Sequence, residues 1–181
     1  MAVVTERFID AFEFVRLGKS ASGRVPLARF VRLLSGQPEQ PAGAAAEWWA
    51  RADRGPLGQP LIRLHVRAEP VLRCERCLEP FTLPIDSEVA LQLVETEDEL
   101  DADQAEPAAE DDPAADFEKV LGSRKFDLHE QVEDELILCV PYVPKHDVCP
   151  AGSGQEAGQA PGKPSPFAVL ARLKDRAGEG E

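Results

Sequence analysis

The sequence predicts an α+β protein: a mostly antiparallel β-sheet with two or three helices, an acidic disordered loop and a tethered C-terminal helix. Residues 61–71 alternate between apolar and polar side chains, which is typical of a strand with one face on the core. Residues 81–93 repeat this period, and the pair Cys74 and Cys77 lies between the two segments. Residues 127–140 place apolar side chains three to four positions apart instead, which predicts a helix.

The first third of the chain is expected to form two strands and a short helix. Residues 8–17 are rich in Phe and Val and predict an opening strand. Four apolar side chains at helical spacing predict a short helix over residues 26–34: Leu27, Phe30, Val31 and Leu34. Residues 47–51 predict another strand. Because neighbouring side chains in a strand point to opposite faces, at most one of Trp48 and Trp49 is expected to be exposed.

The two alternating segments around the cysteines are expected to pair as antiparallel strands. The first turns these side chains toward the core: Ile62, Leu64, Val66 and Ala68. In the second segment the apolar positions are Phe81, Leu83, Ile85, Val89, Leu91 and Leu93. Pro84 has no backbone N–H to donate, so it indicates a sheet edge or a bulge.

Most of the protein's acidity is concentrated in one segment. The net charge is −13, but 12 Asp and Glu and no Lys or Arg lie between Glu95 and Glu118. Without these 12, the 33 acidic residues fall to 21 against 20 Lys and Arg, a net charge of −1. Residues 95–116 are therefore predicted to form a disordered acidic loop that can attract a basic partner. The near-neutral remainder can still present a basic face, although non-specific binding to nucleic acid is not expected.

A short strand and a helix are expected after the acidic loop. Phe117 to Val120 predict the strand. Asp127 can cap the following helix, and Glu130 three positions later completes a capping-box pattern. The last turn before Pro141 is apolar on all sides and is expected to be buried.

The elements are expected to form one domain with two tails. Residues 5–94 and 117–149 make up the domain, and the loop at 95–116 interrupts it. Residues 150–181 are predicted to contain a flexible Gly/Pro/Ser-rich linker. An amphipathic helix at 166–174 follows it and is too short to be stable alone.

A cytoplasmic protein is expected from the terminal and apolar patterns. No run of about 18 apolar residues is present, so no membrane span is predicted. The N-terminus lacks the basic and apolar regions of a secretion signal. In that compartment the four cysteines are not expected to form a disulfide framework.

The cysteines suggest a structural zinc site. Cys74 and Cys77 can present two sulfurs to one ion, and His146 and Cys149, in a Pro-bounded loop after the helix, can supply two more ligands. The alternative is a pair of reduced thiols that order nothing, with His146 capping the helix end. A thioredoxin-like redox role is disfavoured because the motif joins two strands and does not open a helix. Cys139 lies in the apolar stripe and is expected to be a small core residue.

A basic stripe is the second candidate site. Five side chains form it, three on the solvent face of one strand and two beyond: Arg63, His65, Arg67, Arg73 and Arg76. Such a stripe can contact the phosphates of RNA. The alternative is a solvated strand face on which Asp86 or Glu88 of the neighbouring strand pair with these bases.

No catalytic constellation is apparent in the sequence. Four acids on the predicted helix are best interpreted as a solvated face near its N-terminus: Glu130, Glu133, Asp134 and Glu135. Phosphate-binding glycine loops, the nucleophile elbow and the H-E-x-x-H motif are all missing. The sequence therefore predicts a protein that is not an enzyme.

Three separated stretches carry a further signal. Residues 72–81 read L-R-C-E-R-C-L-E-P-F, residues 132–147 read V-E-D-E-L-I-L-C-V-P-Y-V-P-K-H-D, and residues 163–170 read K-P-S-P-F-A-V-L. In order and spacing they resemble the YceD family of large-subunit ribosomal RNA accumulation proteins, over roughly residues 5–175. The resemblance implies a cytosolic, non-enzymatic factor in the synthesis, processing or stability of the large-subunit (23S) ribosomal RNA precursor.

Two kinds of direct partner stay open at this point. The protein can bind the large-subunit RNA itself through the basic stripe. As the alternative, the acidic loop and C-terminal helix can hold a basic ribosomal protein during assembly. A small zinc-dependent redox protein is a third possibility, and neither a membrane nor a small-molecule substrate is expected.

Overall fold

The structure is a computed structural model that describes residues 3–4, 7–101 and 117–150. Within these ranges the chain forms the following elements in order: β1 (Val3–Val4), β2 (Phe8–Ile9), α1 (Ala11–Arg16), β3 (Ser20–Pro26), the 3₁₀ helix η1 (Leu27–Arg29), β4 (Ala45–Arg54), β5 (Pro60–Ala68), β6 (Val71–Arg73), β7 (Pro80–Thr82), β8 (Ile85–Val94), α2 (Glu97–Asp101), β9 (Glu118–Leu121), β10 (Phe126–Asp127) and α3 (Leu128–Cys139).

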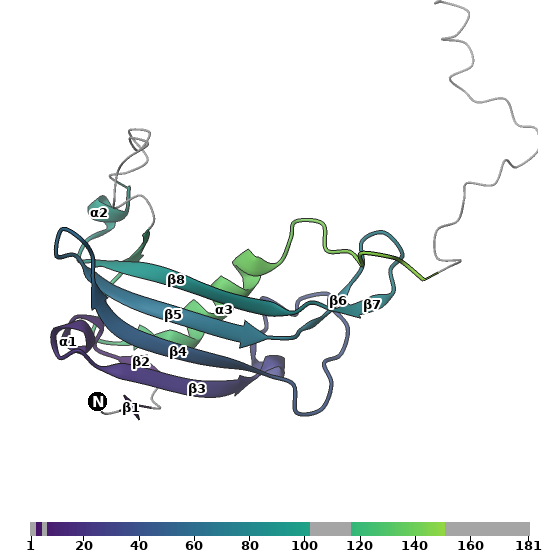
Figure 1. Cartoon of the computed structure of the whole chain (residues 1–181), viewed down its shortest axis with the longest axis horizontal. Helices are drawn as coiled ribbons and strands as arrows, with labels where there is room; N and C mark the ends of the chain where they lie inside the picture. The colour runs from purple at the N-terminus through teal and green to yellow at the C-terminus, as the bar shows by residue number, and fades with distance from the viewer. Residues whose placement is uncertain (1–2, 5–6, 102–116, 151–181) are drawn as a thin grey trace, which may run out of the picture.

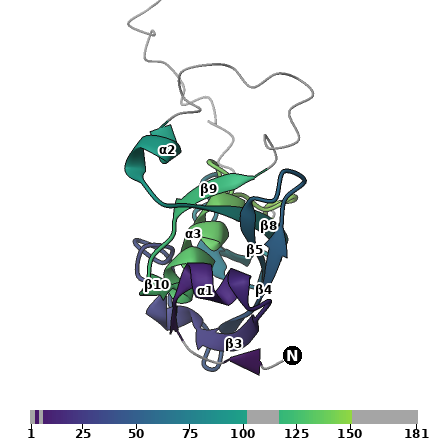
Figure 2. The ribbon, with the colours of Figure 1, turned by 90° about the vertical axis from the view of Figure 1, so that its left-hand side faces the viewer.

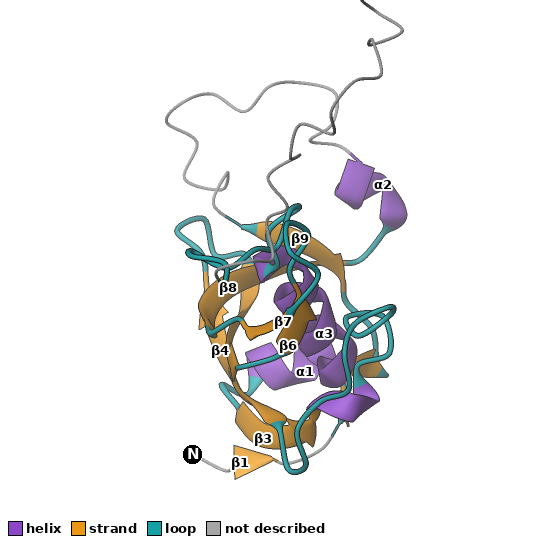
Figure 3. Cartoon of the chain, turned by 90° about the vertical axis from the view of Figure 1, so that its right-hand side faces the viewer, coloured by secondary structure: helices purple, strands orange, loops and turns teal. Residues whose placement is uncertain are grey.

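A six-stranded sheet in the order β1-β3-β4-β5-β8-β9 is the frame of the molecule. Its four central strands are antiparallel, whereas β1 and β9 run parallel to their neighbours. The sheet curves around α1 and α3, which lie on its inner side (Figures 2 and 3). Two small antiparallel pairs, β2–β10 and β6–β7, complete the described part of the fold. The predicted α+β class with a mostly antiparallel sheet is confirmed.

The core fills the space between the inner face of the sheet and the two helices (Figure 1). The alternation in β5 has the predicted result, because Ile62, Leu64 and Val66 are all fully buried. Further large buried side chains come from the neighbouring strands and from the two helices: Trp48 of β4, Leu91 and Leu93 of β8, Phe14 of α1, and Leu128, Val132 and Leu136 of α3. The expected pairing of the two alternating segments is also confirmed, since β5 and β8 are antiparallel.

The strand predicted over residues 8–17 is wrong beyond its first two residues. The chain turns into α1 because the side chain of Asp10 accepts a hydrogen bond from the backbone N–H of Glu13 at 3.0 Å. The apolar residues Phe14 and Val15 then point into the core from the helix. Phe and Val content alone had favoured a strand, and the cap and the packing decided otherwise.

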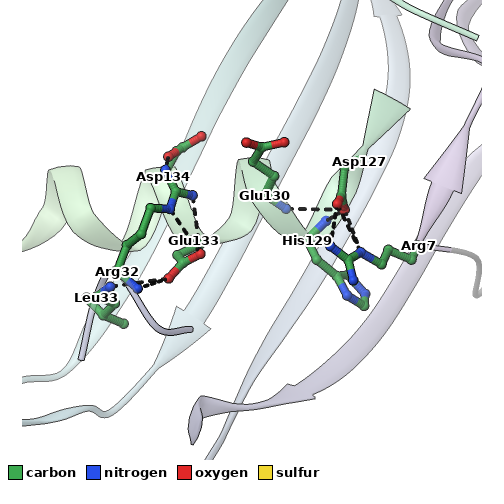
Figure 4. Close-up of polar contacts among 8 residues, drawn as sticks. All are labelled: Arg7, Arg32, Leu33, Asp127, His129, Glu130, Glu133 and Asp134. Atoms are coloured by element: carbon green, nitrogen blue, oxygen red, sulfur yellow. Dashed lines mark hydrogen bonds and ion pairs between the residues drawn. The ribbon is translucent and has the colours of Figure 1, made fainter. Parts of the chain in front are cut away.

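The helix predicted over residues 26–34 is also wrong beyond the single turn of η1. Val31, placed on its apolar stripe, is 74% exposed. The backbone N–H groups of Arg32 and Leu33 donate to Glu133 Oε1 of α3 at 2.7 and 3.2 Å (Figure 4). Contacts with a distant helix therefore satisfy the donors that a continued local helix would have used.

The helix α3 begins as predicted and ends differently. Asp127 caps it by accepting hydrogen bonds from the backbone N–H groups of His129 and Glu130 at 3.0 and 3.4 Å. Arg7 approaches the same carboxylate at 2.6 Å and ties the N-terminal segment to the helix (Figure 4). The prediction of a fully buried last turn is wrong, because Leu138 is 67% exposed. Only one side of the helix faces the sheet.

The first part of the acidic segment is helical. The helix α2 occupies its first residues, so the prediction that all of 95–116 is a disordered loop is wrong for residues 97–101. The rest of that loop and the helix predicted at 166–174 lie outside the described residues. The strand predicted near Phe117 is confirmed as β9. Within the described ranges, no helix combines the length and the apolar character needed to cross a membrane.

The core position Leu136 can be compared with Leu138 on the same helix. Leu136 is 0% exposed, so we expect Leu136→Ala to lower the free energy of unfolding by about 2–5 kcal/mol through the cavity it leaves. Leu138→Ala should lower it by less than about 0.5 kcal/mol. Urea denaturation followed by circular dichroism measures both values, and equal losses would contradict the packing of α3 described above.

Asp127 should make stability depend on pH in the acid range. Its burial opposes ionisation, but the hydrogen bond from Arg7 and those from the backbone of α3 outweigh this and hold its pKa below the usual value. The stabilisation is therefore present above pH 4 and is lost as the pH falls through the lowered pKa. We expect Asp127→Ala to destabilise the protein by about 1 kcal/mol at pH 7.

The difference between wild type and Asp127→Ala should shrink below about pH 4, where Asp127 of the unfolded chain takes up a proton, and it should go on shrinking as the pH falls through the lowered pKa of the folded protein. Glu130→Ala is a matched control because Glu130 lies exposed in the same first turn. Its effect at pH 7 should stay within about 0.5 kcal/mol. Denaturant titrations at pH 7 and pH 3 make the comparison; a pH-independent Asp127→Ala effect would be evidence against the carboxylate as the stabilising group.

Candidate functional site

The first candidate site begins with the tight turn between β6 and β7. The backbone N–H of Cys74 donates to Glu79 O at 3.0 Å, and that of Leu78 donates to Cys74 O at 2.8 Å. Leu78 has φ of 64°, a left-handed conformation that reverses the chain in little space. Pro84 lies in the break between β7 and β8, outside both strands. The hairpin thus holds Cys74 and Cys77 in one turn, as the C-x-x-C spacing predicts.

The loop after α3 folds back onto this hairpin (Figure 1). Pro144 O accepts a hydrogen bond from the backbone N–H of Glu75 at 2.8 Å. The ring of His146 packs on that of Phe81 with the centroids 5.1 Å apart. Arg76 donates to His146 O at 2.9 Å. Contacts on both sides therefore fix the loop that carries His146.

These contacts bring together all four residues proposed as metal ligands: Cys74, Cys77, His146 and Cys149. Their ligand atoms all lie within 4.8 Å of one another. The Sγ atoms of Cys74 and Cys149 are 3.8 Å apart. His146 Nδ1 lies 3.4 Å from Cys77 Sγ and 3.9 Å from Cys149 Sγ. We call these four residues the Cys–His cluster, and it could bind a metal ion.

The surroundings of Cys74 favour its thiolate form. Burial opposes ionisation of Cys74, but hydrogen bonds from the backbone of Cys77, His146 and Arg76 outweigh it and lower the pKa of Cys74 to about 5. Arg76 Nε also donates to Cys149 Sγ at 2.9 Å, and this contact raises the pKa of Arg76 above its usual value. The thiolate is the form that binds metals.

Cys139 does not join the Cys–His cluster. Its sulfur lies 3.6 Å from Glu135 Oε1 on α3, and the residue is half-buried against the core. Burial raises the pKa of Cys139. This placement agrees with the prediction of a small core residue.

The second candidate site is the outer face of the sheet, where the basic residues of β5 have acidic partners. Arg63 Nε is 2.5 Å from the Asp53 carboxylate. His65 and Arg67 both contact Asp86, at 2.5 and 2.7 Å. The hydrogen bonds from His65 and then Arg67 lower the pKa of Asp86. These contacts match the alternative prediction from the sequence, in which the bases lie on a solvated strand face and pair with neighbouring acids.

The other two members of the predicted stripe lie elsewhere. The chain leaves the six-stranded sheet at Ala68, so Arg73 is an exposed residue on the β6–β7 hairpin. Its backbone N–H donates to Gln37 Oε1 at 2.9 Å. No carboxylate pairs with its guanidinium in the part of the chain that the structure describes. Arg76 donates to Cys149 and to the backbone of His146 at the Cys–His cluster, so the five bases do not form one continuous surface.

Sequence reasoning missed three residues around Trp49. Trp49 is 41% exposed on the outer face, whereas Trp48 is 1% exposed in the core, as the alternation predicted. Ser20, Ser22 and Arg51 line a hollow beside the indole of Trp49. The alternation of side chains along β3 and β4 would have placed Ser20, Ser22 and Arg51 on the same outer face as Trp49.

Together, the fold and the Cys–His cluster define a class of small α+β protein in which a cysteine hairpin is tied to a distant loop. The family model described as "Large ribosomal RNA subunit accumulation protein YceD" matches residues 62–174. This chain therefore belongs to the YceD family, as its sequence motifs predicted. The match takes in the Cys–His cluster and begins after β4.

A relative with the same description is known from Haemophilus influenzae. It is 35% identical over 112 residues, which cover 58% of this chain and 60% of the relative. The aligned region thus spans less than two thirds of the relative's length. No solved structure matches this chain.

Proposed function

We propose that this protein promotes the accumulation or processing of large-subunit (23S) ribosomal RNA in the cytoplasm, and that it acts by binding rather than by catalysis. Membership of the YceD family supports the proposal, since the family's description names accumulation of the large ribosomal RNA subunit. The matched residues 62–174 include β5, the hairpin and the Cys–His cluster, so both candidate sites contribute to the shared region. The proposed partner is the large-subunit RNA precursor.

The proposed RNA contacts are those of the basic stripe: Arg63, His65, Arg67, Arg73 and Arg76. Their contributions should differ, because a phosphate must compete with any carboxylate already bound. Arg63 and Arg67 hold carboxylates of the sheet. Arg73 is exposed on the hairpin and carries a charge that no neighbouring acid offsets in the described ranges. Arg73 is therefore expected to contribute most to phosphate binding.

We propose further that the Cys–His cluster holds a structural zinc ion. Three cysteines and one histidine are a common zinc ligand set, with Zn–S bonds of about 2.3 Å and Zn–N bonds of about 2.0 Å. A tetrahedron with those bonds separates two sulfurs by about 3.8 Å and a sulfur from a nitrogen by about 3.5 Å. The separations of 3.8, 3.4 and 3.9 Å between the ligand atoms support this assignment.

The charge of Arg76 also supports a zinc ion here. Three thiolates around a divalent ion leave one negative charge, which the guanidinium of Arg76 offsets from 2.9 Å. With four protein ligands the ion has no open position for a substrate, so its role is structural. It ties the hairpin to the loop after α3.

Zinc content can be measured on the purified chain. We expect about one zinc per wild-type molecule, and much less in Cys149→Ser because a hydroxyl is a poor substitute for a thiolate ligand. Cys139→Ser is the matched control, since Cys139 lies beside Glu135 and should leave the zinc content unchanged. Wild-type protein without stoichiometric zinc, or equal losses in the two variants, would contradict the assignment.

A second candidate function is retained because of one surface feature. Three acids in a row, Glu97, Asp98 and Glu99, make up the start of α2, and all are exposed. Exposed acids of this kind can hold a basic ribosomal protein before it reaches the RNA. In this alternative the protein still serves large-subunit assembly, but its direct partner is a protein.

Deletion of the gene tests the main proposal. The ratio of large-subunit to small-subunit ribosomal RNA should fall, and the wild-type protein should restore it. Arg73→Glu should restore it less well, because it replaces the unpaired positive charge by a negative one. Arg54→Glu is a matched control at the opposite end of the sheet, where Arg54 donates to a backbone carbonyl. An unchanged ratio after deletion would overturn the proposed function.

Crosslinking in cells distinguishes the two direct partners. Recovery of large-subunit RNA fragments favours the main proposal, and recovery of a basic ribosomal protein without RNA favours the alternative.

A further inference from the structure

We propose that the outer face of the sheet contains a stacking site for one unpaired nucleobase, beside the indole of Trp49. The inference rests on the proposed function, because it specifies what part of an RNA the protein would recognise. The ligand is a base of single-stranded RNA, in addition to the phosphates of its backbone. The site lies on β3, β4 and β5, largely before the residues matched by the family model.

The strand register aligns the residues of this site in rows. One row across the outer face joins Ser22, Trp49, His65 and Glu88 through β3, β4, β5 and β8. The rings of Trp49 and His65 are stacked, with centroids 5.2 Å apart and an interplanar angle of 27°. His65 is held in turn by Asp86 at 2.5 Å. The indole is therefore supported from behind in a fixed orientation.

The other side of the indole is open because the neighbouring strand carries small side chains. Ser20 and Ser22 face Arg51 and Trp49 from β3, where larger residues would cover the indole. A hollow of about 290 Å³ results. Small-molecule sites begin at roughly 300 Å³, so the hollow suits a ligand the size of one base. The serine hydroxyls can donate or accept hydrogen bonds at its edge.

A second hollow extends the first along β3. It is lined by Ser22, Gly23, Arg24, Glu47 and Trp49, so open space continues along β3 past the indole. Arg51 borders the first hollow and pairs there with Glu88 at 3.6 Å, and Arg24 borders the second hollow together with Glu47. These two arginines are four residues apart in register, roughly 13 Å along the strands. A strand of RNA laid over Trp49 would therefore meet an arginine on each side of the stacked base, and each arginine has an acid beside it.

The charge balance of the face favours stacking as the main source of affinity. The basic residues of β5 already contact Asp53 and Asp86, so a purely electrostatic contact with RNA would be weak here. Aromatic stacking does not depend on net charge, and each type of base has a face that can stack. Bases within a duplex have both faces covered by neighbours. The site should therefore select single strands.

The experiment uses the purified full chain and an unstructured oligouridylate of about 12 nucleotides, with an RNA duplex of equal length as comparison. Fluorescence anisotropy of the labelled RNA measures the affinity of every variant, and in the wild type quenching of tryptophan fluorescence reports mainly on Trp49 because Trp48 is buried. We expect Trp49→Ala to weaken binding of the single strand roughly 5- to 100-fold, and Trp49→Phe to retain most of it. Neither change should alter affinity for the duplex.

Ser22→Arg provides an independent variant that leaves Trp49 in place. It fills the hollow while adding a positive charge, so stacking predicts weaker binding of the single strand and a purely electrostatic contact predicts stronger binding. Thermal melts of each variant establish that the fold is retained. Weaker binding by Ser22→Arg and Trp49→Ala, with recovery in Trp49→Phe, would support the stacking site.

Two other outcomes separate this inference from the proposed function. If the wild type binds RNA but Trp49→Ala and Ser22→Arg bind the single strand as well as it does, the stacking site is wrong and RNA binding stands. If the wild type binds neither RNA and crosslinks only to a basic protein, the RNA partner and the stacking site are both wrong.

Discussion

The packing of α3 against the inner face of β5 and β8 is the contact on which the other features of this protein depend. Leu128, Val132 and Leu136 occupy one side of the helix and are fully buried against the sheet. This contact fixes both ends of the helix. At its N-terminus Asp127 forms an ion pair with Arg7, and the chain beyond its C-terminus returns to the β6–β7 hairpin. We therefore expect the Cys–His cluster to assemble only when α3 is docked, so that its formation is coupled to folding.

The same strand alternation that builds the core also builds the candidate RNA surface. Ile62, Leu64 and Val66 of β5 are buried beneath α3, and Arg63, His65 and Arg67 alternate with them on the outer face. The register of the strands then decides which side chains meet on that outer face. Asp86 of β8 contacts both His65 and Arg67 of β5, and serines of β3 lie beside the indole of Trp49. The result is a face with paired charges and one open aromatic ring. A base-stacking contact suits such a face better than broad attraction to phosphates.

The two candidate sites lie at different places and perform different tasks in this view. The Cys–His cluster joins a hairpin to a loop about 70 residues away in sequence, and Arg76 offsets its charge. The outer sheet face is the proposed contact surface, and Arg73 lies apart from it on the β6–β7 hairpin. A zinc ion would therefore influence RNA binding indirectly, through the placement of the hairpin.

The sequence by itself determined the features that depend on local order: the alternation of β5 and β8, the cap and apolar stripe of α3, the C-x-x-C turn and the motifs of the YceD family. It also placed His146 and Cys149 in the cluster. Tertiary structure decided whatever depends on distant partners. Glu133, about 100 residues away, ended the helix expected after Pro26, and packing turned residues 11–16 into α1. The sequence had offered Asp86 as a partner for the bases of β5, and the structure added Asp53 as the partner of Arg63. The hydrophobic periodicity of a sequence predicts which face of a strand a residue lies on, but the partner of its side chain depends on which strands become neighbours.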